Sequence, residues 1–399
     1  MKEGFSSETI SVNDSSSLQW PILLGSLAFG ILSFLLPIYG KRLGASALGI
    51  GGLFSIFSIT TVMIRPLVGW ALDRFGRKFF FVAALVCYAG AMGLFSIASD
   101  VAALYLARLV QGIGSSLMWI SAYTIAIDLT SAEGRGKAVG RVDEAAARGA
   151  LYGALVGFTL LVWLPLRTGW RVLFVSYALL ATVGAWLAWK NVPETRPSHL
   201  VRAGSGRAIS WPLFRLMVIV FVTGVSTAMI SPLLLIFLQD KFTTDVGVLA
   251  LAFIPAALVY SFLPSRLGRL SDRFGRTPLI AIGLTGSGLV SLFLPGLPSI
   301  GWLIALWALE ALGLVMAAPA QEALVADLTG SGVRGAGYGL YTFSASLGAT
   351  FGPLLGGWLY DAAGQAAPFY LNGIVLLASA VWVLILLGGS YSKRQRDIA

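Results

Sequence analysis

Apolar residues are gathered in twelve long segments that are separated by short polar loops. Each segment is close to the ~20 residues that an α-helix needs to cross the hydrocarbon core of a bilayer. The pattern therefore predicts an all-α membrane protein with twelve transmembrane helices. The expected spans are 19–40, 47–72, 78–98, 101–128, 137–164, 169–190, 212–238, 246–267, 277–297, 300–326, 335–361 and 367–389.

The composition supports this interpretation and excludes several function classes. Hydrophobic residues make up 57% of the chain and charged residues only 12%, whereas about a quarter of a soluble domain is charged. The single cysteine (Cys87) and the single histidine (His199) cannot form an intramolecular disulfide or a Cys/His metal site. The chain contains no G-x4-GK[ST] loop, so we expect no ATP hydrolysis, no enzyme activity, no metal and no cofactor.

One sequence pattern occurs twice at a separation of half the chain. Gly69–Arg77 (GWALDRFGR) returns as Gly268–Arg276 (GRLSDRFGR), 199 residues later in a chain of 399. Asp128–Arg135 and Asp327–Arg334 repeat an acid-x6-arginine element at the same separation. These repeats predict two six-helix halves of the same orientation, related by an axis along the membrane normal. The expected division is a tail at 1–18, a first half at 19–190, a linker at 191–211, a second half at 212–389 and a tail at 390–399.

The positive net charge of +10 is distributed as a topology signal. Of the 28 Lys and Arg residues, twenty fall in loops or tails on one predicted side, five on the other, and Arg65, Arg108 and Arg148 within apolar spans. This bias predicts that both termini lie in the cytoplasm, and it argues against a nucleic-acid partner. The polar first 17 residues lead into a full-length apolar helix without a small-residue cleavage site, so we expect no cleaved signal peptide.

The repeated motifs carry a family resemblance over essentially the whole chain. Gly69-x3-Asp73-Arg74-x-Gly76-Arg77-Lys78 resembles the loop signature of the major facilitator superfamily, and Gly268–Arg276 resembles its second-half copy. The segment Arg108–Gly114 (RLVQGIG) resembles the fourth-helix motif of the bacterial drug:proton antiporters of that superfamily. The resemblance implies a monomeric, multi-pass transporter of the inner membrane that works by alternating access.

Two features depart from the exporter pattern. The glycine run Gly348–Gly357 has the shape of the antiporter motif but lies in the eleventh span, whereas exporters carry it in the fifth. The fifth-span counterpart, Gly149–Phe158, lacks the proline and the last glycine. Close helix packing alone would also explain both runs. The first and seventh spans contain no acidic residue, although some drug exporters have one there.

Carboxylates within apolar spans are candidates for proton coupling because burial in lipid makes their ionised form costly. Glu310 is the first candidate, since no cation stands three or four positions away on its helix. Asp143 and Glu144 follow in the fifth span, where Glu144 and Arg148 have the i, i+4 spacing of a helical ion pair. The alternative is that all three carboxylates form structural ion pairs between helices.

A central cavity between the two halves is the expected substrate site. Arg108 and Gln111 in the fourth span and Arg148 in the fifth would supply its polar groups, and aromatic side chains its apolar surface. The candidate substrate-binding residues are Arg148, Arg108, Gln111, Trp119, Tyr123, Trp307 and Tyr341. Core packing and lipid contact are the competing explanations for each of the aromatic residues.

The two loop motifs are the expected gate. Their glycines allow a tight turn, and Asp73 and Asp272 can offer negative charge to helix N-termini or to neighbouring arginines. Ion pairs here would close the cytoplasmic mouth and break as the halves move; a purely topological basic loop is the alternative. The candidate gating residues are Asp73, Arg74, Arg77, Asp128, Arg135, Asp272, Arg273, Arg276, Asp327 and Arg334.

Three functions remain open from the sequence. The first is proton-coupled export of small amphipathic or hydrophobic compounds, with a small-molecule substrate, protons and the lipid bilayer as partners. The second is proton-coupled uptake of a sugar or an organic anion, with Arg148 and Arg108 binding the anionic group. The third is a membrane scaffold or signalling protein that transports nothing.

Overall fold

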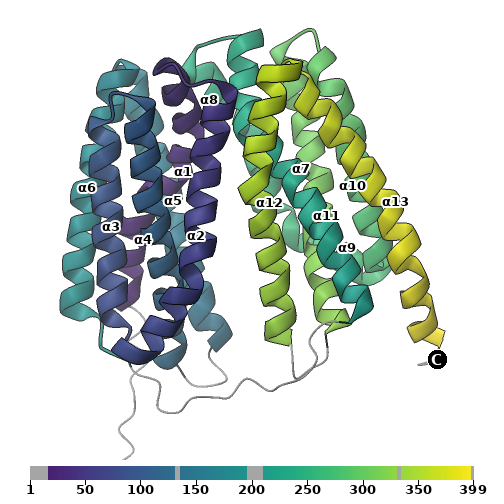
Figure 1. Cartoon of the computed structure of the whole chain (residues 1–399), viewed down its shortest axis with the longest axis horizontal. Coiled ribbons are helices and arrows are strands. Elements are labelled where there is room, and N and C mark those ends of the chain that lie inside the picture. The colour runs from purple at the N-terminus through teal and green to yellow at the C-terminus, as the bar shows by residue number, and fades with distance from the viewer. Residues whose placement is uncertain (1–16, 131–134, 196–209, 330–333, 397–399) are drawn as a thin grey trace, which may run out of the picture. The chain divides into compact units, whose positions relative to one another are not determined.

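A computed structural model of the chain describes residues 17–130, 135–195, 210–329 and 334–396. These residues form thirteen α-helices, with a short 3-10 turn before the eleventh, and no strand occurs among them. The helices, shown in Figure 1, are α1 (Gln19–Arg42), α2 (Ala47–Phe75), α3 (Lys78–Ile97), α4 (Val101–Asp128), α5 (Arg135–Trp163), α6 (Leu166–Asn191), α7 (Trp211–Lys241), α8 (Val246–Phe262), α9 (Pro264–Phe274), α10 (Arg276–Phe293), α11 (Ile300–Leu328), α12 (Arg334–Ala363) and α13 (Ala367–Arg396). The 3-10 turn is Leu294–Gly296.

The prediction of twelve spans is confirmed, with one correction to the eighth. The expected continuous helix over 246–267 is interrupted at Leu263, so that α8 and α9 together take its place. Pro264 explains the break because it has no backbone N–H and is favoured in the first turn of a new helix. The second helix then continues through the loop motif to Gly275, whose φ of +93° ends it.

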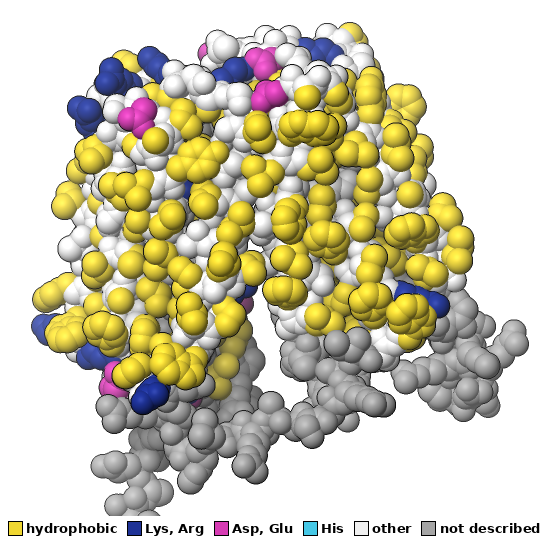
Figure 2. Space-filling model, viewed as in Figure 1, with side chains coloured by type: hydrophobic (Ala, Val, Ile, Leu, Met, Phe, Trp, Pro, Cys, Tyr) yellow, Lys and Arg dark blue, Asp and Glu magenta, His cyan; other side chains and the backbone are white. Residues whose placement is uncertain are grey.

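The helices have the length and surface of membrane spans. Ten helices in the described part of the chain are long and apolar enough to cross a bilayer, and the apolar stretch Val246–Tyr260 of α8 is shorter. Figure 2 shows hydrophobic side chains over the flanks of the molecule, with Lys, Arg, Asp and Glu gathered toward its ends. Large apolar side chains such as Met63, Trp163 and Ile385 are more than two-thirds exposed. Such surface is stable against lipid rather than water, so the chain is a multi-pass membrane protein.

The chain divides into two compact units. Unit 1 lies within Met1–Leu35 and Thr60–Val201, and unit 2 within Leu36–Ile59 and Arg202–Ala399. The end of α1 and the first turns of α2 therefore pack with unit 2, although they belong to the first half of the sequence. The two six-helix halves expected from the sequence follow the order of the helices along the chain, whereas the two units are defined by contacts between residues.

The core of unit 1 is built where α3 packs against α4 and α6. Trp170 of α6 is fully buried and donates its indole N–H to the carbonyl oxygen of Phe95 at 2.6 Å. Its ring lies against Phe174, with the ring centroids 4.3 Å apart. Tyr177 buries its ring on the same side and donates its hydroxyl to the carbonyl of Gly153 at 2.6 Å. The polar groups of Trp170 and Tyr177 are thus both satisfied inside the bundle.

The core of unit 2 is built where α10 packs against α11 and α13, and where α7 packs against α12 and α13. It is almost entirely aliphatic. Its buried members include Leu216, Ile219, Ile280, Leu284, Ala320 and Leu376.

The glycine runs of the fifth and eleventh spans serve close helix packing. Gly153 of α5 and Gly352 of α12 are 199 positions apart. A Cβ on Gly153 would overlap the carbonyl of Leu27 in α1, and a Cβ on Gly352 would overlap the carbonyl of Val225 in α7. Only glycine allows these helix backbones to approach so closely. Packing therefore accounts for both runs, as the simpler of the two interpretations expected.

Candidate functional site

Glu310 is the centre of a buried polar cluster in unit 2. Its side chain comes from the middle of α11 and is 3% exposed. The amide nitrogen of Asn372 on α13 donates to Glu310 Oε1 at 3.2 Å. Ser287 of α10 donates its hydroxyl to the backbone carbonyl of Glu310 at 2.8 Å. A carboxyl group is thus held in the hydrophobic interior of the bundle by neutral partners.

The other carboxyl oxygen of Glu310 is differently placed. Within the described residues, Oε2 is buried and has no hydrogen-bond partner. Tyr260 of α8 lies near enough for its hydroxyl to interact electrostatically with this carboxyl group. An open oxygen in such a site is a natural place for a proton, since protonation removes the charge that the apolar surroundings disfavour.

Two serines complete the cluster. Ser226 of α7 donates its hydroxyl to Asn372 Oδ1 at 2.6 Å, and the Asn372 amide nitrogen donates to Ser291 Oγ of α10 at 2.9 Å. Ser291 in turn donates to the carbonyl of Phe369 at 3.1 Å. The sequence analysis missed Asn372, Ser226 and Ser291 because it considered only carboxylates as parts of the proton site.

The equivalent region of unit 1 has a different character. Arg108 and Gln111 of α4 are 6% and 2% exposed, and Arg108 donates to Gln111 Oε1 at 2.8 Å. The hydroxyl of Tyr88 on α3 lies within electrostatic reach of Arg108. Two of the predicted substrate-binding residues are therefore brought together, but inside the bundle of unit 1.

A stack of aromatic rings forms a half-buried face of unit 1. Phe29 of α1 stacks on Trp119 of α4 with ring centroids 6.0 Å apart, and Trp119 stacks on Tyr123 at 5.8 Å. Tyr123 donates its hydroxyl to Asp143 Oδ1 of α5 at 2.5 Å, and Arg65 of α2 lies within electrostatic reach of Tyr123. The stack ends in a polar group, which is the arrangement of a surface for an amphipathic molecule.

The predicted ion pair in α5 is confirmed. Arg148 Nη2 pairs with Glu144 Oε1 one turn earlier, and both side chains are about half exposed. With Trp20 of α1 and Tyr152 of α5, they line a cavity of about 240 Å³ between α1 and α5. Glu144 is therefore neutralised on its own helix.

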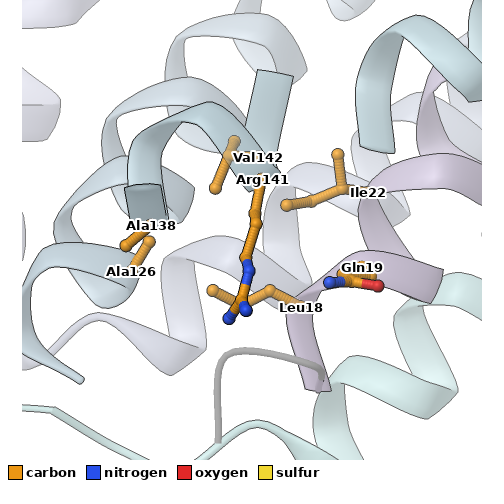
Figure 3. A pocket seen from close by; sticks show the side chains of 7 residues that line it. All are labelled: Leu18, Gln19, Ile22, Ala126, Ala138, Arg141 and Val142. Carbon is orange, nitrogen blue, oxygen red and sulfur yellow. The ribbon is translucent and has the colours of Figure 1, made fainter. Parts of the chain in front are cut away.

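A second hollow near this cavity gives no site. Figure 3 shows Arg141 of α5 reaching toward Leu18 at the start of α1, among side chains that are otherwise mostly apolar. The hollow has no room for a water molecule. It is a packing crevice beside the cavity of Glu144 and Arg148.

The loop motifs contain one repeated ion pair. Arg77 at the start of α3 pairs with Asp128 at the end of α4, and Arg77 is 5% exposed. The equivalent pair is Arg276 with Asp327, where Nε lies 3.3 Å from Oδ2 and the Asp327 side chain is 42% exposed. Each pair joins helices of a single unit. Both pairs bring together residues from the candidate gating set.

Glu194, at the start of the predicted linker, occupies the N-terminus of α3. Its Oε1 accepts hydrogen bonds from the backbone N–H of Arg77 at 2.6 Å and of Lys78 at 3.2 Å. Gly76 adopts a φ of +91°, and a Cβ there would overlap the Glu194 carboxylate. The sequence analysis offered Asp73 either for a helix N-terminus or for a neighbouring arginine, and its side chain lies outside the described residues; the carboxylate seen at the start of α3 is Glu194.

The remaining gating candidates are only partly described. The guanidinium of Arg74 lies over the ring of Trp70, and that of Arg273 over Phe274, as expected for arginines near a lipid headgroup layer. The side chains of Asp73, Arg135, Asp272 and Arg334 lie outside the described residues.

A polar cluster that the sequence did not indicate joins the ends of four helices in unit 2. Lys41 of α1 pairs with Asp240 of α7, and Tyr360 of α12 donates its hydroxyl to Asp240 Oδ2 at 2.8 Å. Asp361 accepts hydrogen bonds from the first backbone N–H groups of α2, at 3.1 Å from Ala47 and 2.8 Å from Leu48. Lys41 and Asp240 are themselves 199 positions apart.

The two aromatic candidates of unit 2 lie in packed positions. Trp307 stands one turn before Glu310 and meets Phe253 of α8 edge to face, with ring centroids 4.5 Å apart. Tyr341 of α12 packs against the aliphatic core of unit 2. In the described part of the chain, no three His, Cys, Asp or Glu side chains are grouped so that they could hold a metal ion.

Comparison with known proteins places the chain among transporters. The family model of the Major Facilitator Superfamily matches residues 22–215 and again residues 216–398. Multidrug resistance protein 1 of Bacillus subtilis (strain 168) is 24% identical over 89% of this chain and 91% of its own length. The class B tetracycline resistance protein of Escherichia coli is 23% identical over 94% of this chain and 95% of its own.

Solved structures agree in fold. The nucleoside transporter NupG superposes with a TM-score of 0.75 at 13% identity, covering 94% of this chain and 99% of that one. A bacterial homolog of the human lysosomal transporter Spinster, in an inward-facing and unoccupied conformation, gives a TM-score of 0.71 at 16% identity, with 96% of both chains covered.

Proposed function

Because this chain belongs to the Major Facilitator Superfamily and is a transporter rather than an enzyme, we propose that it exports small amphipathic or hydrophobic compounds in exchange for protons. The names of its relatives support drug efflux. The observation that carries the proton step is the buried carboxyl group of Glu310, which has an open oxygen and neutral hydrogen-bond partners.

Glu310 is the better proton carrier among the three candidate carboxylates. Glu144 forms an ion pair with Arg148, and Asp143 accepts the hydroxyl of Tyr123; both side chains are exposed and have polar partners. Glu310 has an amide as its partner and little solvent. Of the three carboxylates, Glu310 therefore gains the most free energy when a proton neutralises its charge.

The substrate contacts the aromatic stack of unit 1. Trp119 and Tyr123, together with Phe29, offer half-buried rings beside the polar group of Asp143. Arg108 and Gln111 lie deeper and support α4 from within. Arg148, Trp307 and Tyr341 remain candidates for the other surfaces of the substrate path.

The remaining features of the proposal concern placement and gating. The chain is a monomer in the inner membrane with both termini in the cytoplasm, in accord with the bias of Lys and Arg. The two loop motifs and their ion pairs change partners as the cytoplasmic mouth opens and closes. The transporter works as two six-helix halves, 19–190 and 212–389, joined by the linker at 191–211.

Uptake of an organic anion is the second candidate function. Arg108 supports it because its buried guanidinium, which donates to Gln111, places a cationic group in the interior of unit 1. An anionic substrate would be attracted to that charge. The direction of transport separates the two functions.

The test uses inverted membrane vesicles energised by a proton gradient. Wild-type protein should accumulate ethidium and, on its addition, move protons in the opposite sense. Glu310→Gln keeps the shape and the amide contact but cannot ionise, so it should abolish proton-driven accumulation while the protein still inserts. Glu322→Gln is the matched control, because Glu322 is an exposed carboxylate on the same helix. Wild-type coupling in Glu310→Gln would remove the proposal, and uptake of a labelled organic acid by whole cells would favour the second function.

A further inference from the structure

Asn372 is the hub of the polar cluster around Glu310. It is 1% exposed, and its carboxamide makes hydrogen bonds to α7, α10 and α11 from its own place on α13. One amide hydrogen goes to Ser291 Oγ and the other to Glu310 Oε1, while Oδ1 accepts from Ser226. The side chain therefore uses both donors and its acceptor.

The direction of these bonds is fixed by the serines. Ser291 donates to the carbonyl of Phe369, so its oxygen can accept from the Asn372 amide nitrogen. Ser226 donates to Oδ1, so the oxygen of the amide must face α7. The nitrogen is then left to face Glu310. The cluster thus presents a hydrogen-bond donor to the carboxyl group, which favours the ionised carboxylate.

The fold does not require this cluster. The positions 199 residues earlier are Leu27, Met92, Gln111 and Leu173, which are all buried in unit 1. Three polar side chains of unit 2 are therefore replaced by leucine and methionine in the same places of the other unit. Buried polar groups, even when hydrogen-bonded, often give no more stability than apolar side chains of similar size, so stability alone does not explain this cluster.

We infer that Asn372 is a positioning residue for the proton site: it holds Oε1 of Glu310, directs Oε2 to receive the proton, and is itself oriented by Ser226. This inference rests on the proposed function, since it assigns the proton to Glu310. When a proton binds Oε2, an O–H bond forms and the carboxylate charge is lost. The hydrogen bond from Asn372 then changes from a charge-assisted bond to a weaker neutral one.

The groups that surround Glu310 allow its titration to be followed separately. Tyr260 faces it from α8 and is the titratable side chain within electrostatic reach among the described residues. The side chains that contact it or its hub from α7, α10 and α13 are serines and the amide, and these do not titrate. A carboxyl signal from this site can therefore be assigned to Glu310.

Infrared difference spectroscopy of the full-length protein in lipid vesicles, over a series of pH values, tests the inference without a substrate. The carboxylic C=O band that disappears in Glu310→Gln identifies the site. Asn372→Leu places the residue of unit 1 at the hub and removes the donor to Oε1. The pH at which the band has half its full intensity should then rise by about one unit, a tenfold change in proton concentration. The frequency of the band should change as well.

Two further variants keep the inference testable if Asn372→Leu does not fold. Ser226→Ala frees the amide to turn and should shift the midpoint in the same direction by a smaller amount. Ser287→Ala is the matched control, because Ser287 touches only the backbone carbonyl of Glu310 in this cluster, and it should leave the band unchanged. A wild-type midpoint and frequency in both Asn372→Leu and Ser226→Ala would overturn the inference. Absence of any titrating band that depends on Glu310 would instead overturn the proposed proton site.

Discussion

Position 111 in unit 1 and position 310 in unit 2 occupy the same place in the two repeats, yet their side chains and surroundings differ. Gln111 is neutral and accepts a hydrogen bond from Arg108, while Glu310 is ionisable and has a tryptophan, Trp307, where unit 1 has that arginine. Around Gln111 the equivalent positions are leucine and methionine; around Glu310 they are serine and asparagine. The comparison teaches that equivalent regions of a duplicated fold can hold different ionisable groups: a buried guanidinium, Arg108, in unit 1 and a buried carboxyl group, Glu310, in unit 2.

The largest expected effect on stability comes from removal of the carboxylates that pair with the loop-motif arginines Arg77 and Arg276. Asp128→Asn leaves the nearly buried Arg77 without its ion pair and should lower the free energy of unfolding by about 3 kcal/mol. Asp327→Asn should cost only about 0.5 kcal/mol, because both side chains of its pair with Arg276 are more exposed than those of the first pair. Thermal unfolding of both variants in the same detergent measures the difference. Equal losses would show that burial does not separate the two motifs.

The glycine contacts should behave alike in both units. Gly153→Ala and Gly352→Ala each place a methyl group against a backbone carbonyl of the neighbouring helix, so each should lose about 1–3 kcal/mol. Gly140→Ala and Gly339→Ala are controls at equivalent positions that have open space around the added Cβ. These should be neutral or stabilise by up to about 1 kcal/mol, since alanine favours the helix. The apparent Tm of the four variants measures the effect, and a loss confined to one unit would contradict equivalent packing.

The smallest expected effect concerns the start of α3. Glu194→Ala removes a carboxylate from the helix N-terminus and should lower stability by about 0.5–1 kcal/mol. At the equivalent start of α10 the residue before Arg276 is Gly275, which has no side chain to cap the helix. Hydrogen exchange of the backbone N–H groups of Arg77 and Lys78 measures the local effect. Unchanged protection there would show that the carboxylate does not hold this helix end.

Much of the fold follows from local rules of the sequence. Eleven of the twelve expected spans are single helices, most of them with nearly the same limits, because a run of about twenty apolar residues in lipid must satisfy its backbone hydrogen bonds internally. The pairing of Glu144 with Arg148 was predictable for the same reason, since i, i+4 residues meet on any helix. The break at Leu263 was missed because an apolar run hides a helix end that only Pro264 reveals.

The site was predictable only in part. Glu310 could be found because an ionisable group in an apolar span is costly wherever its helix lies. Asn372, Ser226 and Ser291 could not, since uncharged polar residues are tolerated in many membrane helices and their spacing along the chain gives no sign of contact. Comparison of each position with the one 199 residues away would have drawn attention to them.

The sequence by itself determined the number of spans, the duplication and the presence of an unneutralised carboxylate in the tenth span, because these depend on hydropathy and on neighbours within one helix. Only the tertiary structure decided which side chains from α7, α10 and α13 meet Glu310, and that Lys41 meets Asp240, because those contacts join residues from separate helices. The rotation of each helix about its axis and its packing against its neighbours decide which side chains meet. Close backbone contacts, such as that of Gly352 with α7, hold the helices in these positions.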